Sequence, residues 1–126
     1  MREPDASQFQ KPREDMVVSV CFSELAASPT TFSALREVAA TLDRAFRFRE
    51  IILVVDDTQR EAFLPLIAEV PNCRLFVVRR GTEYYDRRVI GAEDAIGELV
   101  VIGTLDEIVH LDLIAFLAHA ERENTV

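Results

Sequence analysis

Hydrophobic residues fall into two alternating patterns along the chain. Four short, nearly continuous apolar runs have the length of strands and lie at residues 16–22, 50–55, 73–78 and 98–102. Four longer stretches repeat apolar residues every three or four positions, which predicts helices, and cover residues 32–46, 58–70, 83–96 and 108–121. Strands that alternate with helices imply right-handed crossovers and a parallel sheet. The pattern therefore predicts an α/β fold, a three-layer α/β/α domain with a mainly parallel sheet of about four strands.

Local signals refine the first two helices. Ser28 or Thr30 is suited to cap the first one. In the second, Phe63, Leu64 and Ile67 form the predicted apolar face. Pro65 is expected to kink that helix unless it lies in the first turn.

The last two helices carry weaker signals. Residues on one predicted packing face of the third helix are Tyr84, Arg88, Ala92 and Ile96, so Tyr84 is expected in the core. Residues 103–107 are predicted to form the turn before the last helix.

The central apolar run, residues 51–55, stops at two adjacent carboxylates, Asp56 and Asp57. A continuous run of this kind fits a strand covered on both faces. Ligands of open parallel sheets bind at the carboxyl ends of the strands. Asp56 and Asp57 are therefore predicted to lie at a ligand-binding edge, although Asp is also common there because it forms turns and caps helices.

Composition narrows the class of protein. Its 14 basic and 22 acidic residues give a net charge of −8, which argues against a general nucleic-acid binder. No apolar run reaches the roughly 18 residues that span a bilayer. Residues 1–15 are polar and are expected to be a disordered lead-in rather than a signal peptide, followed by one domain at 16–121 and a polar tail at 122–126. We expect a cytoplasmic protein.

Arginines are concentrated after the third strand, at positions 79, 80, 87 and 88. They are either a solvated stretch or a local anion site. If they bind an anion, Arg79, Arg80 and Arg88 are the candidate residues.

A nucleotide fits the predicted edge. If the first strand lies between the second and fourth, the ends of those two strands are roughly 10 Å apart. Asp56 or Asp57 can then accept hydrogen bonds from a base or ribose. Asp106, after the fourth strand, can hold Mg²⁺ or Mn²⁺ against a diphosphate, or simply cap the last helix. Neither a Gly-x-Gly-x-x-Gly motif nor a Walker motif is present.

Cysteine and histidine show no catalytic or zinc-binding pattern. Cys21 and Cys73 both fall inside apolar strands, so we expect buried free thiols.

Several segments together resemble the N-terminal, donor-binding half of family 2 glycosyltransferases, which have the Rossmann-like GT-A fold. They are VVSV at 17–20, IILVVDD at 51–57, RLFVVR at 74–79 and GAEDAIGELVVI at 91–102, and the resemblance covers roughly residues 16–118. It implies that Asp56 or Asp57 contacts the nucleotide of a sugar donor. It also implies that Asp106 is the last carboxylate of the family's Asp-x-Asp metal motif, in which Thr104 replaces the first.

The resemblance favours a nucleotide-sugar-binding domain for glycosyl transfer that is incomplete or weakly active alone, because the acceptor-binding half is missing. The alternative is a catalytically inactive relative that serves as an interaction or regulatory module. A response-regulator receiver fits poorly, because the acidic pair follows the second strand and the only lysine is Lys11. The two open edges of a four-stranded sheet also predict a homo-oligomer or a partner chain.

Overall fold

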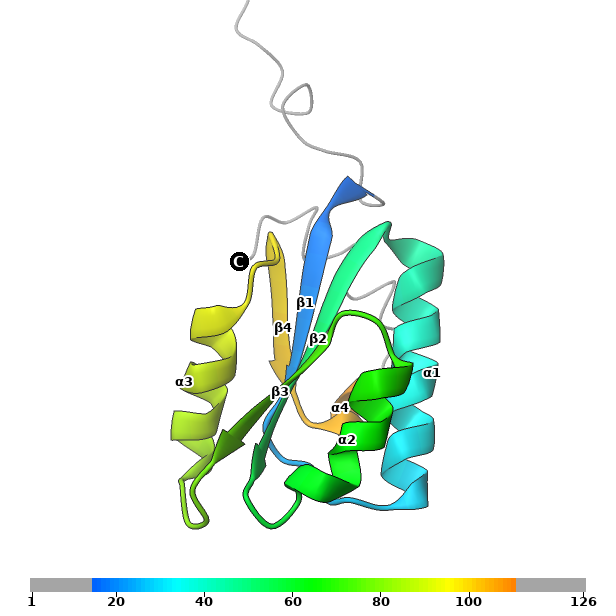
Figure 1. Cartoon of the computed structure of the whole chain (residues 1–126). Coiled ribbons are helices and arrows are strands. Elements are labelled where there is room, and N and C mark those ends of the chain that lie inside the picture. The colour runs from blue at the N-terminus through cyan, green and yellow to red at the C-terminus, as the bar shows by residue number, and fades with distance from the viewer. Residues whose placement is uncertain (1–14, 111–126) are drawn as a thin grey trace, which may run out of the picture.

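The computed structural model describes residues 15–110 (Figure 1). Its elements, in chain order, are β1 (Val17–Phe22), α1 (Pro29–Ala45), β2 (Phe48–Asp56), α2 (Arg60–Glu69), β3 (Cys73–Val78), α3 (Tyr84–Asp94), β4 (Leu99–Gly103) and α4 (Leu105–His110). The predicted lead-in up to residue 14, the predicted tail and the predicted helix beyond residue 110 lie outside the described residues. None of the helices in the described part is long and apolar enough to cross a membrane.

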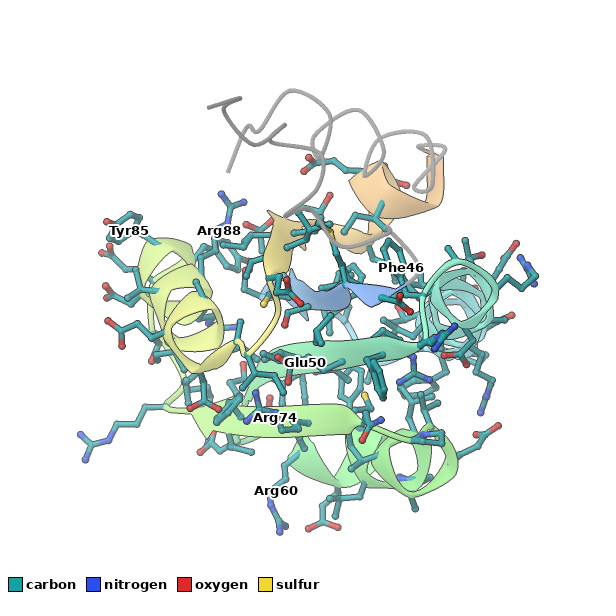
Figure 2. All side chains as sticks on the ribbon, turned by 90° about the horizontal axis from the view of Figure 1, so that it is seen from above. Phe46, Glu50, Arg60, Arg74, Tyr85 and Arg88 are labelled. Carbon is teal, nitrogen blue, oxygen red and sulfur yellow. The ribbon has the colours of Figure 1, made fainter. Side chains whose placement is uncertain are left out.

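The four strands form one sheet in the order β3-β2-β1-β4, and every neighbouring pair is parallel. Helices α1, α2 and α4 cover one face, and α3 covers the other (Figures 1 and 2). The prediction of a three-layer, Rossmann-like α/β fold is therefore confirmed.

Strand alternation sorts the core into two clusters. Ile51, Leu53 and Val55 point from β2 into the larger cluster, together with residues of α1, α2 and α4. Ile52 and Val54 point to the opposite face, into a smaller cluster beside α3. Because both faces of β2 are covered, its sequence is continuously apolar.

The N-terminus of α1 is capped by Ser28. Its hydroxyl accepts the amide of Thr31 at 3.1 Å, and Pro29 occupies the first helical position, where no amide donor is needed. Of the two predicted caps, Ser28 is the one used.

The apolar face of α2 is shifted from the prediction. Phe63 and Leu66 are buried, whereas Leu64 is 36% exposed. Phe63 meets the ring of Phe32 edge to face, with centroids 5.2 Å apart. Pro65 lies inside the helix beyond its first turn.

The predicted packing face of α3 is wrong. Tyr84 is 59% exposed, and the residues that face the sheet are Arg87 and Gly91. Gly91 faces the sheet, where an added Cβ would contact Val54 Cγ2 at 3.4 Å, an ordinary van der Waals distance. Apolar periodicity misses this face because a glycine and a paired arginine form it.

Both cysteines are confirmed as free and buried. Burial raises the pKa of the Cys21 and Cys73 thiols to about 11. They are inert thiols within the core.

Candidate functional site

The strand order places a topological switch point between β1 and β4. From β1 the chain moves through β2 to β3 in one direction, and then returns to place β4 on the other side of β1. The connections after β1 and β4 lead to α1 and α4, which lie on the same face of the sheet and contact each other, and a crevice lies between these two connections beyond the strand ends. Open α/β sheets bind their ligands at this position.

A crevice of about 650 Å³ lies at this point. It is lined by the β1–α1 loop, the first turns of α1 and the start of α4, through Glu24, Leu25, Ala26, Thr30, Thr31, Ala34, Thr104, Leu105 and Asp106. Its walls combine aliphatic side chains with threonine hydroxyls and two carboxylates. This volume is within the range of small-molecule sites, which is about 300–1,000 Å³.

Two hydrogen bonds hold the β1–α1 loop in place. The Gln59 side-chain amide donates to the Leu25 carbonyl at 2.8 Å, and the Ser28 cap fixes the start of α1. Ser23, the residue before this loop, is buried, and within residues 15–110 its hydroxyl has no hydrogen-bond partner. The loop that forms one wall of the crevice is thus anchored at the start of α2 and at the start of α1.

The other wall is set by Thr104. Its hydroxyl accepts the Glu107 amide at 3.2 Å and donates to the Glu107 carboxylate at 2.9 Å. Thr104 thus caps α4, and Asp106 lies in the first turn of that helix. The predicted turn at 103–107 and the predicted helix start at 108 are therefore wrong. Capping also explains why threonine suits this position.

Two carboxylates are the candidate metal ligands of the crevice. Glu24 and Asp106 both line the crevice. Nevertheless, within residues 15–110 no group of three or more His, Cys, Asp and Glu side chains could hold a metal. The metal role of Asp106 stays a prediction.

Asp56 and Asp57 lie at the carboxyl end of β2, outside the residues that line the crevice. Asp56 accepts the Thr58 amide at 2.9 Å and also the Thr58 hydroxyl. The hydroxyl is the main reason that the pKa of Asp56 lies below its ordinary value, and Arg87 and Arg80 lower this pKa further. Asp56 therefore shapes the turn after β2, as the simpler sequence interpretation allowed.

Arg80 and Arg88, near this edge, each face a carboxylate of the same chain. Arg80 Nε lies 3.3 Å from Asp57, and Arg88 Nη2 lies 2.8 Å from Glu24. Arg88 rises from α3 toward the β4 side of the sheet (Figure 2). Through Glu24, Arg88 is linked directly to the crevice, whereas Arg80 and Asp57 are not among its lining residues.

Arg87 and Arg79 have contacts of a different kind from those of Arg80 and Arg88. Arg87 is buried, donates to the Thr82 carbonyl at 3.0 Å and lies 3.9 Å from Asp56. The backbone carbonyl of Arg79 accepts the Thr82 amide at 3.1 Å, which closes the turn after β3. The predicted site residues therefore lie in different places. Asp106 lines the crevice and Arg88 is at its rim, whereas Asp56, Asp57, Arg79 and Arg80 lie toward β2 and β3.

A second polar cluster, which the sequence did not reveal, lies at the opposite end of the sheet. The buried Glu50 carboxylate accepts hydrogen bonds from the Ser19 hydroxyl, from the Ile96 amide at 2.7 Å and from Arg74 Nη2 at 2.7 Å. Arg74 also binds Asp94 at the end of α3 (Figure 2 shows Arg74 beside Glu50). The one sign of this cluster in the sequence was a charged residue, Glu50, directly before the apolar run at 51–55.

This cluster is saturated by its own members. Arg74 Nε and Nη2 both donate to Glu50 Oε1, and Gly97 donates its amide to Ser19 Oγ at 2.8 Å. Burial raises the pKa of Glu50, but the hydrogen bonds from Ser19, Ile96 and Arg74 and the Arg74 charge outweigh it, so the pKa is lowered overall. The cluster joins β1, β2, β3 and α3, which indicates a structural role.

Comparison of the chain with protein-family models, with curated proteins and with solved structures finds no match.

Proposed function

We propose that this domain binds a nucleotide-sugar at the carboxyl edge of its sheet and acts in glycosyl transfer as a donor-binding domain. The crevice at the β1/β4 switch point carries the proposal, because its position follows from strand order and its volume suits a small ligand. The resemblance of residues 51–57 and 91–102 to family 2 glycosyltransferases supplies the ligand class. We place this activity in the cytoplasm.

The lining suits a ligand with many hydroxyl groups. Thr30, Thr31 and Thr104 offer hydroxyl oxygens, and Glu24 and Asp106 offer carboxylate oxygens. These groups accept hydrogen bonds from ribose or sugar hydroxyls. The aliphatic side chains of the same crevice can pack against the apolar face of a sugar or a base.

The phosphates of such a ligand would meet Arg88 at the rim. Its pair with Glu24 is largely open to water, with side chains 46% and 27% exposed, respectively. Exposed pairs are worth about 0–1 kcal/mol, so a diphosphate can replace Glu24 as the partner of Arg88. Release of Glu24 would in turn free its oxygens for ligand hydroxyls.

Calorimetric titration with UDP, GDP and a UDP-sugar, each with and without Mn²⁺, tests the proposal. Ala34→Leu would fill part of the crevice from α1, and we expect it to weaken binding at least about tenfold. Ser33→Leu is the matched control, because residue 33 is the exposed neighbour on the same helix and does not line the crevice. If nucleotides at millimolar concentration give neither heat nor a thermal shift, the domain does not bind this ligand class.

A specific observation favours the alternative, an interaction or regulatory module. Arg80, Arg87 and Arg88 all lie near carboxylates of this chain, so much of the edge charge is already neutralised. In that case the carboxyl edge of the sheet would be part of the fold without binding a nucleotide. The same titration separates the two functions, because only the first requires nucleotide binding.

A further inference from the structure

Strand β4 forms an outer edge of the sheet and carries no charged residue. Its sequence is LVVIG, and among the described residues no strand pairs with its outer side. Val100 and Ile102 are each 42% exposed. Exposed edges usually carry charges, prolines or bulges that prevent pairing with another chain, and β4 has none of these.

The backbone groups of β4 that point away from the sheet belong to the same two residues, Val100 and Ile102. The Ile51 amide donates toward β3, to the Asn72 carbonyl at 3.0 Å, and the Ile51 side chain lies on the α1 face. In parallel strands of one sheet, residues whose side chains share a face also point their peptide groups to the same side. Residues on the α3 face therefore point their peptide groups away from β3.

Val100 and Ile102 are on the α3 face, because they are in register with Ser19 and Cys21 of β1. Their N–H and C=O groups consequently point away from β1, to the open edge. The edge thus presents two pairs of backbone donors and acceptors beside two exposed apolar side chains.

We propose that a second copy of this chain pairs with this edge, β4 against β4, antiparallel about a two-fold axis at Val101. In this register Val100 of one copy is opposite Ile102 of the other, and both positions form hydrogen-bonded pairs. The arrangement is self-complementary, as a two-fold dimer requires. It makes four backbone hydrogen bonds and joins the exposed Val100 and Ile102 side chains of both copies into one apolar patch on the α3 face.

The charges near each edge favour β4 over β3. Antiparallel pairing of β3 with itself about Val77 would place Arg74 of one copy opposite Arg80 of the other. Like charges near one another across a strand pair are destabilising. At β4 the same operation brings Glu98 of one copy opposite Thr104 of the other, so the pairing opposes no like charges.

Sedimentation velocity of the full chain from about 2 to about 200 µM tests the proposal. One five-residue strand is a small contact compared with stable interfaces, which bury about 1,200–2,000 Å², so we expect a reversible dimer. The double variant Val100→Lys/Ile102→Lys places like charges opposite one another and should be monomeric throughout. Val77→Lys, at a residue 43% exposed on the other outer strand, is the matched control and should dimerise as the wild type does.

Two further measurements define the register. Mixing the Lys/Lys variant with Val100→Glu/Ile102→Glu should restore a one-to-one heterodimer, because opposite charges then face each other. Hydrogen exchange at the Val100 and Ile102 amides should slow as protein concentration rises. These readouts hold even if one variant is less stable than the wild type.

The proposal is overturned if the wild type stays monomeric at every concentration, or if the Lys/Lys variant dimerises normally. Protection of the Val100 and Ile102 amides that does not change with concentration would also overturn it, because the edge would then be covered by the chain itself. None of these measurements involves nucleotide, so the outcome is independent of the proposed ligand.

Discussion

Replacing Arg74 with methionine would remove the cation from a carboxylate that the fold has buried. The Glu50 side chain is 6% exposed, and Arg74 Nη2 lies 2.7 Å from its Oε1 atom. Methionine keeps much of the aliphatic stem of Arg74 but offers no donor. The Ser19 hydroxyl and the Ile96 amide would remain as donors to Glu50.

The expected loss of stability follows from the burial of the two partners. Removing one member of a buried ion pair costs about 3–5 kcal/mol, because the other charge is left without compensation. Arg74 is itself 39% exposed, so water can reach the space it leaves. We therefore expect Arg74→Met to lower the free energy of unfolding by about 2–3 kcal/mol at pH 7.

Urea unfolding followed by circular dichroism measures this loss, and Arg36→Met provides the control. Arg36 also binds a glutamate through two nitrogens, but both partners are about half exposed, at 49% and 53%. Exposed pairs contribute about 0.2–1 kcal/mol. Losses for Arg74→Met and Arg36→Met that agree within about 0.5 kcal/mol would refute the argument that burial of Glu50 sets the magnitude.

The pH dependence provides a second check. The folded-state pKa of Glu50 is lowered below its ordinary value of 4.5, so the stability that Glu50 contributes is present above that pH and is lost as pH falls through the folded pKa. Without Arg74, the pKa of Glu50 should be higher than in the wild type, because the hydrogen bonds and the charge of Arg74 no longer lower it. Protonation of Glu50 then removes a larger part of the destabilisation in the variant. The stability difference between wild type and Arg74→Met should therefore narrow on acidification below pH 4.5, and a constant difference would contradict this account.

Two other predictions concern the packing around the sheet. Gly97→Ala would place a Cβ 2.5 Å from Ser19 Oγ and 2.6 Å from the Ser19 amide nitrogen. We expect the free energy of unfolding to fall by about 2–3 kcal/mol in the same urea assay. Gly103→Ala is the control and should cost under about 1 kcal/mol, because the nearest neighbour of its Cβ is Ile108 Cδ1 at 3.4 Å. Equal losses would argue against the close approach of Gly97 to Ser19. Because burial raises the pKa of the Cys21 and Cys73 thiols to about 11, both should react slowly with a disulfide reagent at pH 8 in the native protein and rapidly in urea, and fast native labelling would show that they are accessible.

Local sequence determined the fold class of this protein. Branched apolar runs and helical stripes alternate, and that order leaves a parallel sheet with helices on both faces as the simplest structure. The run at residues 51–55 identified the central strand because a strand covered on both faces must be apolar at every position. Ser28 was among the predicted helix caps for a similarly local reason, a hydroxyl placed just before the helix.

Tertiary structure decided the rest, because it depends on which distant residues meet. Glu50 directly precedes the apolar run of β2, and only the register with Ser19 and the approach of Arg74 from β3 show that it is a buried, paired carboxylate. Apolar periodicity chose the wrong face of α3, because the residues that face the sheet are Gly91, which has no side chain, and Arg87, which pairs with Asp56 of β2. The crevice between the β1–α1 loop and the start of α4 likewise depends on strand order, which the sequence does not encode locally.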